Sequence, residues 1–476
     1  MTTTTAAPLD WGTNREMNGL EALMWRAEAD PRLRSTICGV QELDATPDWE
    51  RLVAAHDWAS RLVPRFRQRV VEPALGLGVP VWANDPDFDL HYHVRRARLP
   101  EGGGFAALLA AAEQIAMTPF DRARPLWEAV LFEGLPDGRS AYLLKLHHAT
   151  TDGLGSVQLL SQLYSRTREP NPRKVQVAPP PPDGLTSSRA LAEQALQGAG
   201  ALPRTVAGGG RAALRALADP LHRGRAALRF GRSLQRVLAD PDADASPLLR
   251  ERSLSWRWLA LDLAFADLRA ASKAAGGSLN DAYVAALLGG FRRYHAELGV
   301  PLDRMPVAIP MSVRTDDDAA GGNRFAGARL ALPAGIADPA QRIAAVRDAV
   351  RGVRDEPALN ALGLIAPGLA RLPAPLISQL AGGLTRSNDL QASNVPGLRE
   401  DVYIAGAKIE RAYGFGPLPG CATMVTLVSH GDRCCVGVNL DPAAVTEPER
   451  FARCLVEGFE EILALAEDSG PVVLRT

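Results

Sequence analysis

The stretch Leu143-Leu144-Lys145-Leu146-His147-His148-Ala149-Thr150-Thr151-Asp152-Gly153 decides the fold. Residues Ala141 to His148 are rich in leucine and end in a turn signal, which predicts a buried β-strand. A helical pattern from Ser156 to Tyr164 follows directly. Strand and helix signals that alternate in this way are typical of an α/β fold.

The strand ends in two imidazoles, with a carboxylate four residues beyond the second. An imidazole titrates near neutral pH and can take a proton from a hydroxyl, and a carboxylate can orient it. Neighbouring side chains on a strand point to opposite faces, so His147 and His148 cannot share one substrate or one metal ion. We expect one of them to face a cleft and the other to be packed behind it. The alternative is a pair of core histidines beside a turn aspartate.

Composition narrows the class of protein. The chain has 476 residues, 46% of them hydrophobic, which favours two large globular domains or two to three smaller ones. A net charge of -1 argues against nucleic acid as a partner. No signal peptide or membrane-spanning run is predicted. The five cysteines have no metal-ligand spacing, so we expect reduced thiols, a cytoplasmic protein and no metal site.

Two α/β regions flank a segment of different composition. Residues 1–165 mix strand and helix signals, and alternation resumes from 251 to 476. Between them, residues 166–250 contain a run of four prolines and a run of three glycines, which is typical of a linker. Two halves joined in this way predict a ligand cleft between them.

A basic helix is predicted within the linker. Its arginines, at i, i+4, i+7 and i+11, share one helical face: Arg225, Arg229, Arg232 and Arg236. Such a face can rest on anionic lipid, which would make the protein peripheral to a membrane or a lipid inclusion. The alternative is a solvated helix between the domains.

Several motifs, in order along the chain, resemble the bacterial wax ester synthase/diacylglycerol acyltransferase family, a branch of the CoA-dependent acyltransferases. Residues 147–153 fit its HHxxxDG motif in full, and the resemblance extends from about residue 15 to 465. The other matching stretches are Pro125-Leu126-Trp127, Asn280-Asp281, Ser312-Val313-Arg314, Gly322-Asn323 and Ser393-Asn394-Val395-Pro396-Gly397. HHxxxDG alone also occurs in peptide-synthetase condensation domains; the later motifs favour the acyltransferases.

The resemblance implies an α/β fold of two chloramphenicol-acetyltransferase-like domains with mixed sheets and an active site in a channel at their interface. Residues 1–165 and 251–476 would be the two acyltransferase domains. The implied reaction moves a long-chain acyl group from acyl-CoA, the co-substrate, to diacylglycerol or a long-chain alcohol, with no other cofactor. Two alternatives stay open: a condensation-type enzyme acting on carrier-bound acyl groups, and a non-catalytic lipid-binding relative. Oligomeric state, acyl length and acceptor are not predicted.

By the same resemblance, His148 is the general base and His147 supports it from the other face. Asp152 orients the loop and Gly153 lets the chain turn. Asn280 is the candidate donor to the oxyanion of the tetrahedral intermediate, or else Ser278 or Asn280 is a helix N-cap.

Four further residues are candidates for substrate binding. Trp127 is either an acyl-chain wall or a core residue. Arg314 could pair with the phosphates of CoA or with Asp152. Asn394 and Gly397 either shape a turn beside the cleft or have a purely structural role.

Overall fold

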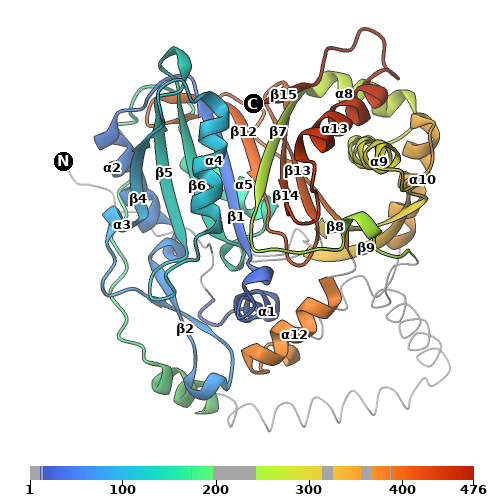
Figure 1. Ribbon diagram of the computed structural model, residues 1–476. Helices are drawn as coiled ribbons and strands as arrows, with labels where there is room; N and C mark the ends of the chain where they lie inside the picture. The colour runs from blue at the N-terminus through green and yellow to red at the C-terminus, as the bar shows by residue number, and fades with distance from the viewer. Residues whose placement is uncertain are drawn as a thin grey trace, which may run out of the picture.

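Two sheets stand side by side in the computed structural model, with helices on their outer faces (Figure 1). The structure describes residues 11, 14–172, 174–196, 243–312, 325–354, 366–385 and 388–475. This is the α/β fold with mixed sheets that the sequence predicts. Arg314, the Gly322-Asn323 motif and the four arginines of the basic linker helix lie outside the described residues.

The first sheet has the strand order β11-β12-β1-β6-β5-β4. Its central pair is β1 (Thr36–Leu43) and β6 (Ser140–His147), which run antiparallel with Thr36 opposite His147. β6 is buried along its whole length, as its run of leucines predicts. The remaining strands and covering helices are β5 (Trp127–Glu133), β4 (Val94–Arg98), α2 (Trp49–Leu62), α3 (Leu90–His93), α4 (Gly104–Met117) and α5 (Gly153–Leu163).

Two strands from the C-terminal half complete this first sheet. β12 (Ala407–Phe415) pairs antiparallel with β1, and β11 (Tyr403–Ile404) pairs with β12. Figure 1 shows β12 in orange beside the blue β1, between the two halves of the molecule. The C-terminal half of the chain therefore contributes two strands to the first sheet. This strand crossover fixes the relative position of the two sheets, and with it the walls of any channel between them.

The second sheet has the order β15-β7-β14-β13-β10-β8-β9. Its pairs are antiparallel except at β10, which runs parallel to both β13 and β8. The strands are β7 (Arg257–Ala264), β8 (Arg304–Ser312), β9 (Phe325–Pro333), β10 (Leu390–Pro396), β13 (Thr423–His430), β14 (Arg433–Leu440) and β15 (Val473–Arg475).

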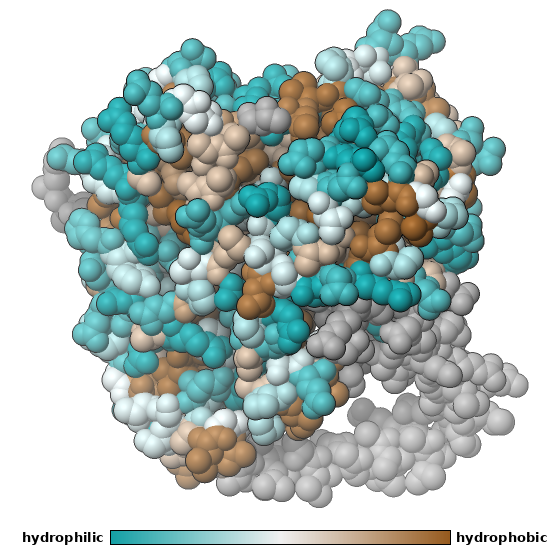
Figure 2. Space-filling view, in the orientation of Figure 1, coloured by the Kyte–Doolittle hydropathy of each residue, from teal (hydrophilic) through white to brown (hydrophobic). Residues whose placement is uncertain are grey.

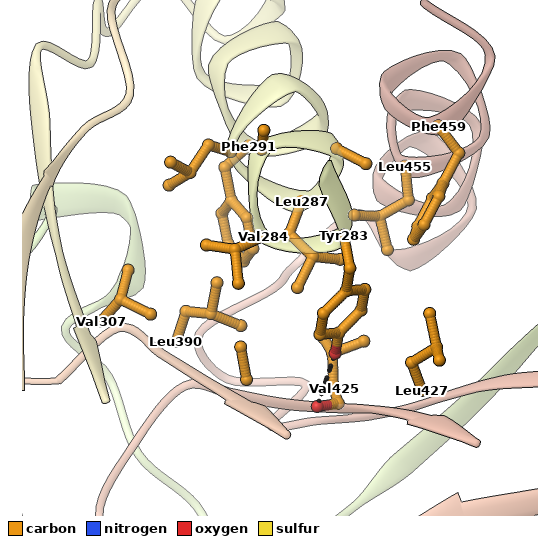
Figure 3. Packing of buried hydrophobic residues seen from close by; sticks show 14 of the residues in the cluster. Tyr283, Val284, Leu287, Phe291, Val307, Leu390, Val425, Leu427, Leu455 and Phe459 are labelled. Atoms are coloured by element: carbon orange, nitrogen blue, oxygen red, sulfur yellow. Dashed lines mark hydrogen bonds between the residues drawn. The ribbon is translucent and has the colours of Figure 1, made fainter. Parts of the chain in front are cut away.

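Helices α8 (Phe265–Ala274), α9 (Leu279–Glu297), α10 (Pro339–Arg354) and α13 (Pro448–Leu463) cover the outer face of this sheet (Figure 1). α9 is apolar on most of its surface, so it lies buried between α10, α13 and the sheet. Figure 3 shows Tyr283 and Leu287 of α9 on the side of Leu455 and Phe459 of α13. Tyr283 Oη donates a hydrogen bond of 2.9 Å to the carbonyl of Val425. This cluster is the larger core of the molecule.

A smaller layer lies below the two sheets in the view of Figure 1. It contains α1 (Gly19–Ala27), which packs against α12 (Ala374–Thr385), and the hairpin of β2 (Gln68–Val71) and β3 (Val81–Asn84). Among the described residues, none of the helices combines the length and the apolar character that crossing a bilayer demands.

Candidate active site

A cavity of about 470 Å³ lies where the two sheets meet. One wall is built from β1, β6 and β12, the opposite wall from β8, β10 and β13, and α5 closes one side. Most of the exposed surface of the lining is apolar, with Ile37, Leu144, Leu146 and Val428 among the aliphatic residues. The polar side chains of the lining are Gln41, His148, Asp152, Ser156, Gln391, Ser393, Asn394, Tyr413 and Thr426. The cavity thus suits a long apolar chain with its reactive end at the polar groups.

His148 lies at the polar part of this cavity. β6 ends at His147, and His148 begins a single 3₁₀ turn (His148–Thr150). The direction of the His148 side chain is therefore set by this turn and not by the alternation of side chains along the strand. The His148 N–H donates a hydrogen bond of 2.7 Å to the carbonyl of Ser35, so its backbone is tied to the start of β1. Its half-buried imidazole lines the cavity. A titratable ring held on a rigid strand end can act on a substrate there.

His147 points away from the cavity, into protein. It is fully buried, and the rings of Trp25 and Phe120 pack edge-on against its imidazole, with centroids 5.8 and 6.2 Å away. Its Nδ1 accepts a hydrogen bond of 3.0 Å from the Ala149 N–H, so the proton of the neutral ring is on Nε2. Nε2 lies 3.1 Å from Glu28 Oε1. The two histidines therefore occupy different environments, and His147 serves to hold the turn.

Glu28 is a half-buried carboxylate with several hydrogen-bond donors and one guanidinium around it. It accepts a hydrogen bond of 2.6 Å from the Ser35 N–H. Burial alone would raise the pKa of Glu28, but His147, the Ser35 N–H and the guanidinium of Arg122 outweigh burial and lower it. The carboxylate thus stays charged behind the turn that carries His148.

Asp152 begins α5. Its Oδ1 accepts a hydrogen bond of 2.7 Å from the Gly155 N–H, which makes it the N-cap of the helix. This cap explains why α5 starts at Gly153, three residues before the helical pattern predicted from the sequence. The N-terminus of a helix carries N–H groups without helical acceptors and a partial positive charge. Because Gly153 also lines the cavity, this positive end lies beside His148.

Two glycines are required at this helix start for different reasons. Gly153 does not have a positive φ; a Cβ there would lie 3.2 Å from Val395 Cγ2, so close approach of β10 is what favours glycine. A Cβ on Gly155 would lie 2.5 Å from Thr151 Oγ1 and 3.0 Å from Asp152 Oδ1. Gly155, which the motif does not include, therefore protects the cap of α5.

Asn280 is not among the residues that line this cavity. It is the second residue of α9, in the outer helical layer of the second sheet. The N-cap is Ser278, whose Oγ accepts from the Asp281 N–H at 3.2 Å, while Asp281 Oδ2 accepts from the Ser278 N–H at 2.8 Å. This reciprocal capping box accounts for the Asn280-Asp281 motif as a helix start.

Trp127 is a core residue. It is 2% exposed, donates a hydrogen bond of 2.8 Å from Nε1 to the Phe66 carbonyl, and stacks on His93 at 4.6 Å. Asn394 lines the cavity from β10. Gly397 follows β10, and a Cβ there would lie 2.4 Å from the carbonyl oxygen of Ser429. The structure thus brings His148, Asp152, Gly153 and Asn394 together, and does not bring Trp127, Asn280 or Gly397 into the cavity.

Two groups of site residues were not predicted from the sequence. One is Ser156, Val157 and Leu160 of α5, which line the cavity from the same helical face as the predicted Gly153, at i+3, i+4 and i+7 from it. That spacing is visible in the sequence as an amphipathic signal. Glu28, in contrast, is separated from His147 by more than a hundred residues, and no local pattern connects them.

Comparison with known proteins identifies the family. The model of the wax ester synthase/diacylglycerol acyltransferase catalytic domain matches residues 15–283, and that of the C-terminal domain of the same family matches residues 321–463. A protein of Mycobacterium tuberculosis (strain H37Rv) with the provisional name diacylglycerol O-acyltransferase is 46% identical over 467 residues, 96% of this chain and 94% of that protein.

Solved structures show the same fold. The wax ester synthase/diacylglycerol acyltransferase of Marinobacter aquaeolei aligns with a TM-score of 0.63 and 20% identity, over 94% of this chain and 98% of that one. The first condensation domain of the calcium-dependent antibiotic synthetase aligns with a TM-score of 0.61 and 17% identity, over 96% and 97%. The chain belongs to the wax ester synthase/diacylglycerol acyltransferase family and is an acyl-CoA-dependent acyltransferase.

Proposed function

We propose that the protein moves a long-chain acyl group from acyl-CoA to the hydroxyl of diacylglycerol or a long-chain alcohol, with His148 as the general base. The observation that carries this proposal is the position of His148, on a rigid strand end at the polar part of an apolar cavity of about 470 Å³. The apolar lining suits a long hydrocarbon chain, and an imidazole is the side chain that most often takes the proton of a hydroxyl in general base catalysis.

In the proposed reaction the alcohol oxygen attacks the thioester carbonyl while His148 takes the hydroxyl proton. A C–O bond forms, and the tetrahedral intermediate then expels the CoA sulfur as the C–S bond breaks. The protonated imidazole returns the proton to the leaving thiolate, so the base is regenerated. The N-terminus of α5, at Gly153, supplies N–H groups and a partial positive charge for the oxyanion.

Replacement of His148 by alanine tests the role of the base. Because a positioned base contributes roughly 10²- to 10⁴-fold, kcat with acyl-CoA and an alcohol should fall by that factor while the unfolding transition is unchanged. Transfer at the normal rate by the variant would overturn the assignment. If the unmodified chain transfers no acyl group to any alcohol, a non-catalytic lipid-binding role is favoured instead.

The acceptor is best determined by competition. Purified protein is given one radiolabelled acyl-CoA with equimolar diacylglycerol and hexadecanol, and the two esters are separated. We expect triacylglycerol as the main product, because the relative with 46% identity bears the name of a diacylglycerol acyltransferase. A predominance of wax ester would reverse that preference.

A condensation-type reaction is the second candidate, because condensation domains share the fold. It requires an acyl group on a carrier protein, and the assay can offer the same acyl chain on CoA and on a carrier. Preference for CoA supports the acyltransferase, and preference for the carrier supports condensation.

We further propose peripheral contact with a lipid surface through the tip of the β2–β3 hairpin. Leu75 is 88% exposed at a left-handed φ of 60°, Leu77 is 51% exposed, and Leu196 is 74% exposed. Gln194 joins the helix over 187–196 to the tip through hydrogen bonds with both the N–H and the carbonyl of Val79. Figure 2 shows a hydrophobic patch at the lower left, the region where Figure 1 places this hairpin.

Vesicle co-sedimentation tests this contact. The double change Leu75→Ser and Leu77→Ser should lower the bound fraction, because it removes apolar side chains that would enter the lipid. Leu254→Ser, at a leucine that is 51% exposed elsewhere, is the matched control and should bind normally. Equal binding by all three proteins would exclude the hairpin as the contact.

A further inference from the structure

The strand β1 forms one wall of the cavity, and its middle lacks a side chain on the cavity side. Ile37, Gly39 and Gln41 alternate on one face, and all three line the cavity. A Cβ built on Gly39 has nothing within 4 Å of it. Glycine in a central strand costs stability and usually marks a close approach of other atoms. Within the part of the chain that the structure describes, no atom makes that approach at Gly39, so the position contributes open space to the cavity.

The neighbouring strand carries small residues on the same face for a different reason. Gly414 on β12 lies directly opposite Gly39, but a Cβ there would lie 3.0 Å from Thr426 Cγ2 and 3.3 Å from Val428 Cγ2 of β13. Gly414 thus allows the second sheet to approach, whereas Gly39 does not serve packing. The two glycines can therefore be compared directly. A side chain at Gly414 would disturb the packing of the two sheets, whereas a side chain at Gly39 would affect only what occupies the cavity.

Gln41 closes the β1 wall. It is 5% exposed, and its Nε2 donates a hydrogen bond to Tyr164 Oη just beyond the end of α5. Burial raises the pKa of Tyr164, so its hydroxyl stays neutral. Gln41 Oε1 is buried and accepts no hydrogen bond from the described residues. A hydrocarbon chain that lies against it cannot supply one, so it is a poor neighbour for such a chain.

We propose that Gly39 determines the chain length that the enzyme accepts: an aliphatic substrate chain runs along β1 from His148, passes over Gly39 and ends at the Gln41–Tyr164 pair. This inference rests on the proposed function and deepens it. The chain belongs either to the acyl donor or to the alcohol acceptor, since both bring an alkyl tail to the same imidazole.

The geometry gives the length. Thr36 is opposite His147, and Gln41 is five residues further along β1, which is about 16 Å at ~3.3 Å per residue. An extended alkyl chain advances about 1.3 Å per carbon, given a C–C bond of about 1.5 Å and an angle of about 111°. The wall of the cavity along β1 therefore matches the length of an extended alkyl chain of about a dozen carbons. Gly39 lies about 10 Å from the start, which corresponds to about eight carbons.

The decisive variant is Gly39→Leu, whose side chain would enter the open space above the strand. We measure kcat/KM for an acyl-CoA series from octanoyl to hexadecanoyl with one fixed alcohol, and for an alcohol series of the same lengths with one fixed acyl-CoA. In one of the two series the ratio of kcat/KM for the dodecyl chain to that for the octyl chain should fall at least about tenfold, because the new side chain blocks the carbons beyond about the eighth and each buried methylene contributes roughly fourfold. The series that responds identifies the source of the chain.

Gly39→Ala and Gly414→Ala provide the controls. Gly39→Ala should shift the ratio in the same direction by less and leave the protein as stable as before, since its Cβ meets no atom. Gly414→Ala should lower the stability because of the contact with Thr426. If Gly39→Leu fails to fold, Gly39→Ala still reports the ratio.

Unchanged ratios in both series for folded Gly39→Leu and Gly39→Ala would overturn this inference and leave the proposed function intact. Failure of the proposed function has a different result, namely no acyl transfer by the unmodified chain from any CoA ester.

Discussion

The starts of α5 and α9 look alike in the sequence but differ in their surroundings. Each follows a capping residue, Asp152 or Ser278, and each carries a family motif that predicts catalytic side chains. α5 begins beside the cavity and presents Gly153 to it, whereas α9 begins in the outer layer of the second sheet, away from the cavity lining. A motif at a helix start can therefore line a cavity at one place and only cap the helix at another. Only the position of the helix in the fold distinguishes the two.

The largest effect on stability is expected at His147, behind the start of α5. His147→Ala removes a fully buried ring and one of the polar partners of the Glu28 carboxylate. The free energy of unfolding should fall by about 3 kcal/mol in a denaturant titration. His148→Ala, at a half-buried position, is the control and should unfold at the same denaturant concentration as the unmodified chain. Equal loss in both variants would mean that the two histidines have the same structural role.

A smaller loss is expected at Gly155. Gly155→Ala places a Cβ against Thr151 Oγ1 and the Asp152 carboxylate, so either the cap or the turn must move. We expect about 2 kcal/mol of destabilisation and a lower kcat, because the same cap positions the N-terminus of α5. Gly352→Ala in α10, where a Cβ would meet no atom within 4 Å, should not destabilise. A Gly155→Ala protein as stable as the unmodified chain would contradict this account of α5.

Substitutions at the start of α9 should change the free energy of unfolding and leave the rate of acyl transfer unchanged. Ser278→Ala removes a cap that the structure shows and should cost about 1 kcal/mol of unfolding free energy. Asn280→Ala, at a partly buried site whose side chain is not the cap, should change it by less than about 0.5 kcal/mol. A larger loss of unfolding free energy in Asn280→Ala than in Ser278→Ala would contradict the assignment of Ser278 as the helix cap.

The smallest effect is a pH dependence that comes from Glu28. Its pKa in the folded protein lies below the ordinary value of 4.5, so the stability that this group contributes is fully present above that value. As the pH falls below 4.5 and through the lowered pKa, the contribution is lost. Glu28→Gln should therefore lower the stability near neutral pH and narrow its difference from the unmodified chain in acid. A difference that grows as the pH falls would have the wrong sign.

Much of the fold was accessible from the sequence because its strands and helices have strong periodic patterns. β6, with its run of leucines, differs from its predicted range by one residue at either end. The exchange of β12 into the first sheet was not predicted, since strand pairing over several hundred residues leaves no local signal. The wall of the cavity depends on that exchange.

The candidate site was predictable where chemistry is local. His148, Asp152 and Gly153 lie in one short stretch of the chain. The two histidines face different surroundings, as strand alternation predicts, although His148 lies in the 3₁₀ turn and not on the strand. Trp127 and Asn280 were harder, because a tryptophan on a strand and an asparagine at a helix start have the same sequence signature in a core as in a site. Gly39 shows no signal at all, since open space beside a glycine is a property of the folded structure.

The most direct test is the rate of the chemical step in a single turnover with acyl-CoA and excess alcohol, compared between His148→Ala and Asn280→Ala. The predicted result is a rate lower by roughly 10²- to 10⁴-fold for His148→Ala and a rate equal to that of the unmodified chain for Asn280→Ala. A normal rate for folded His148→Ala, or a large loss confined to Asn280→Ala, would contradict the claim that acyl transfer takes place at the His148 end of the cavity.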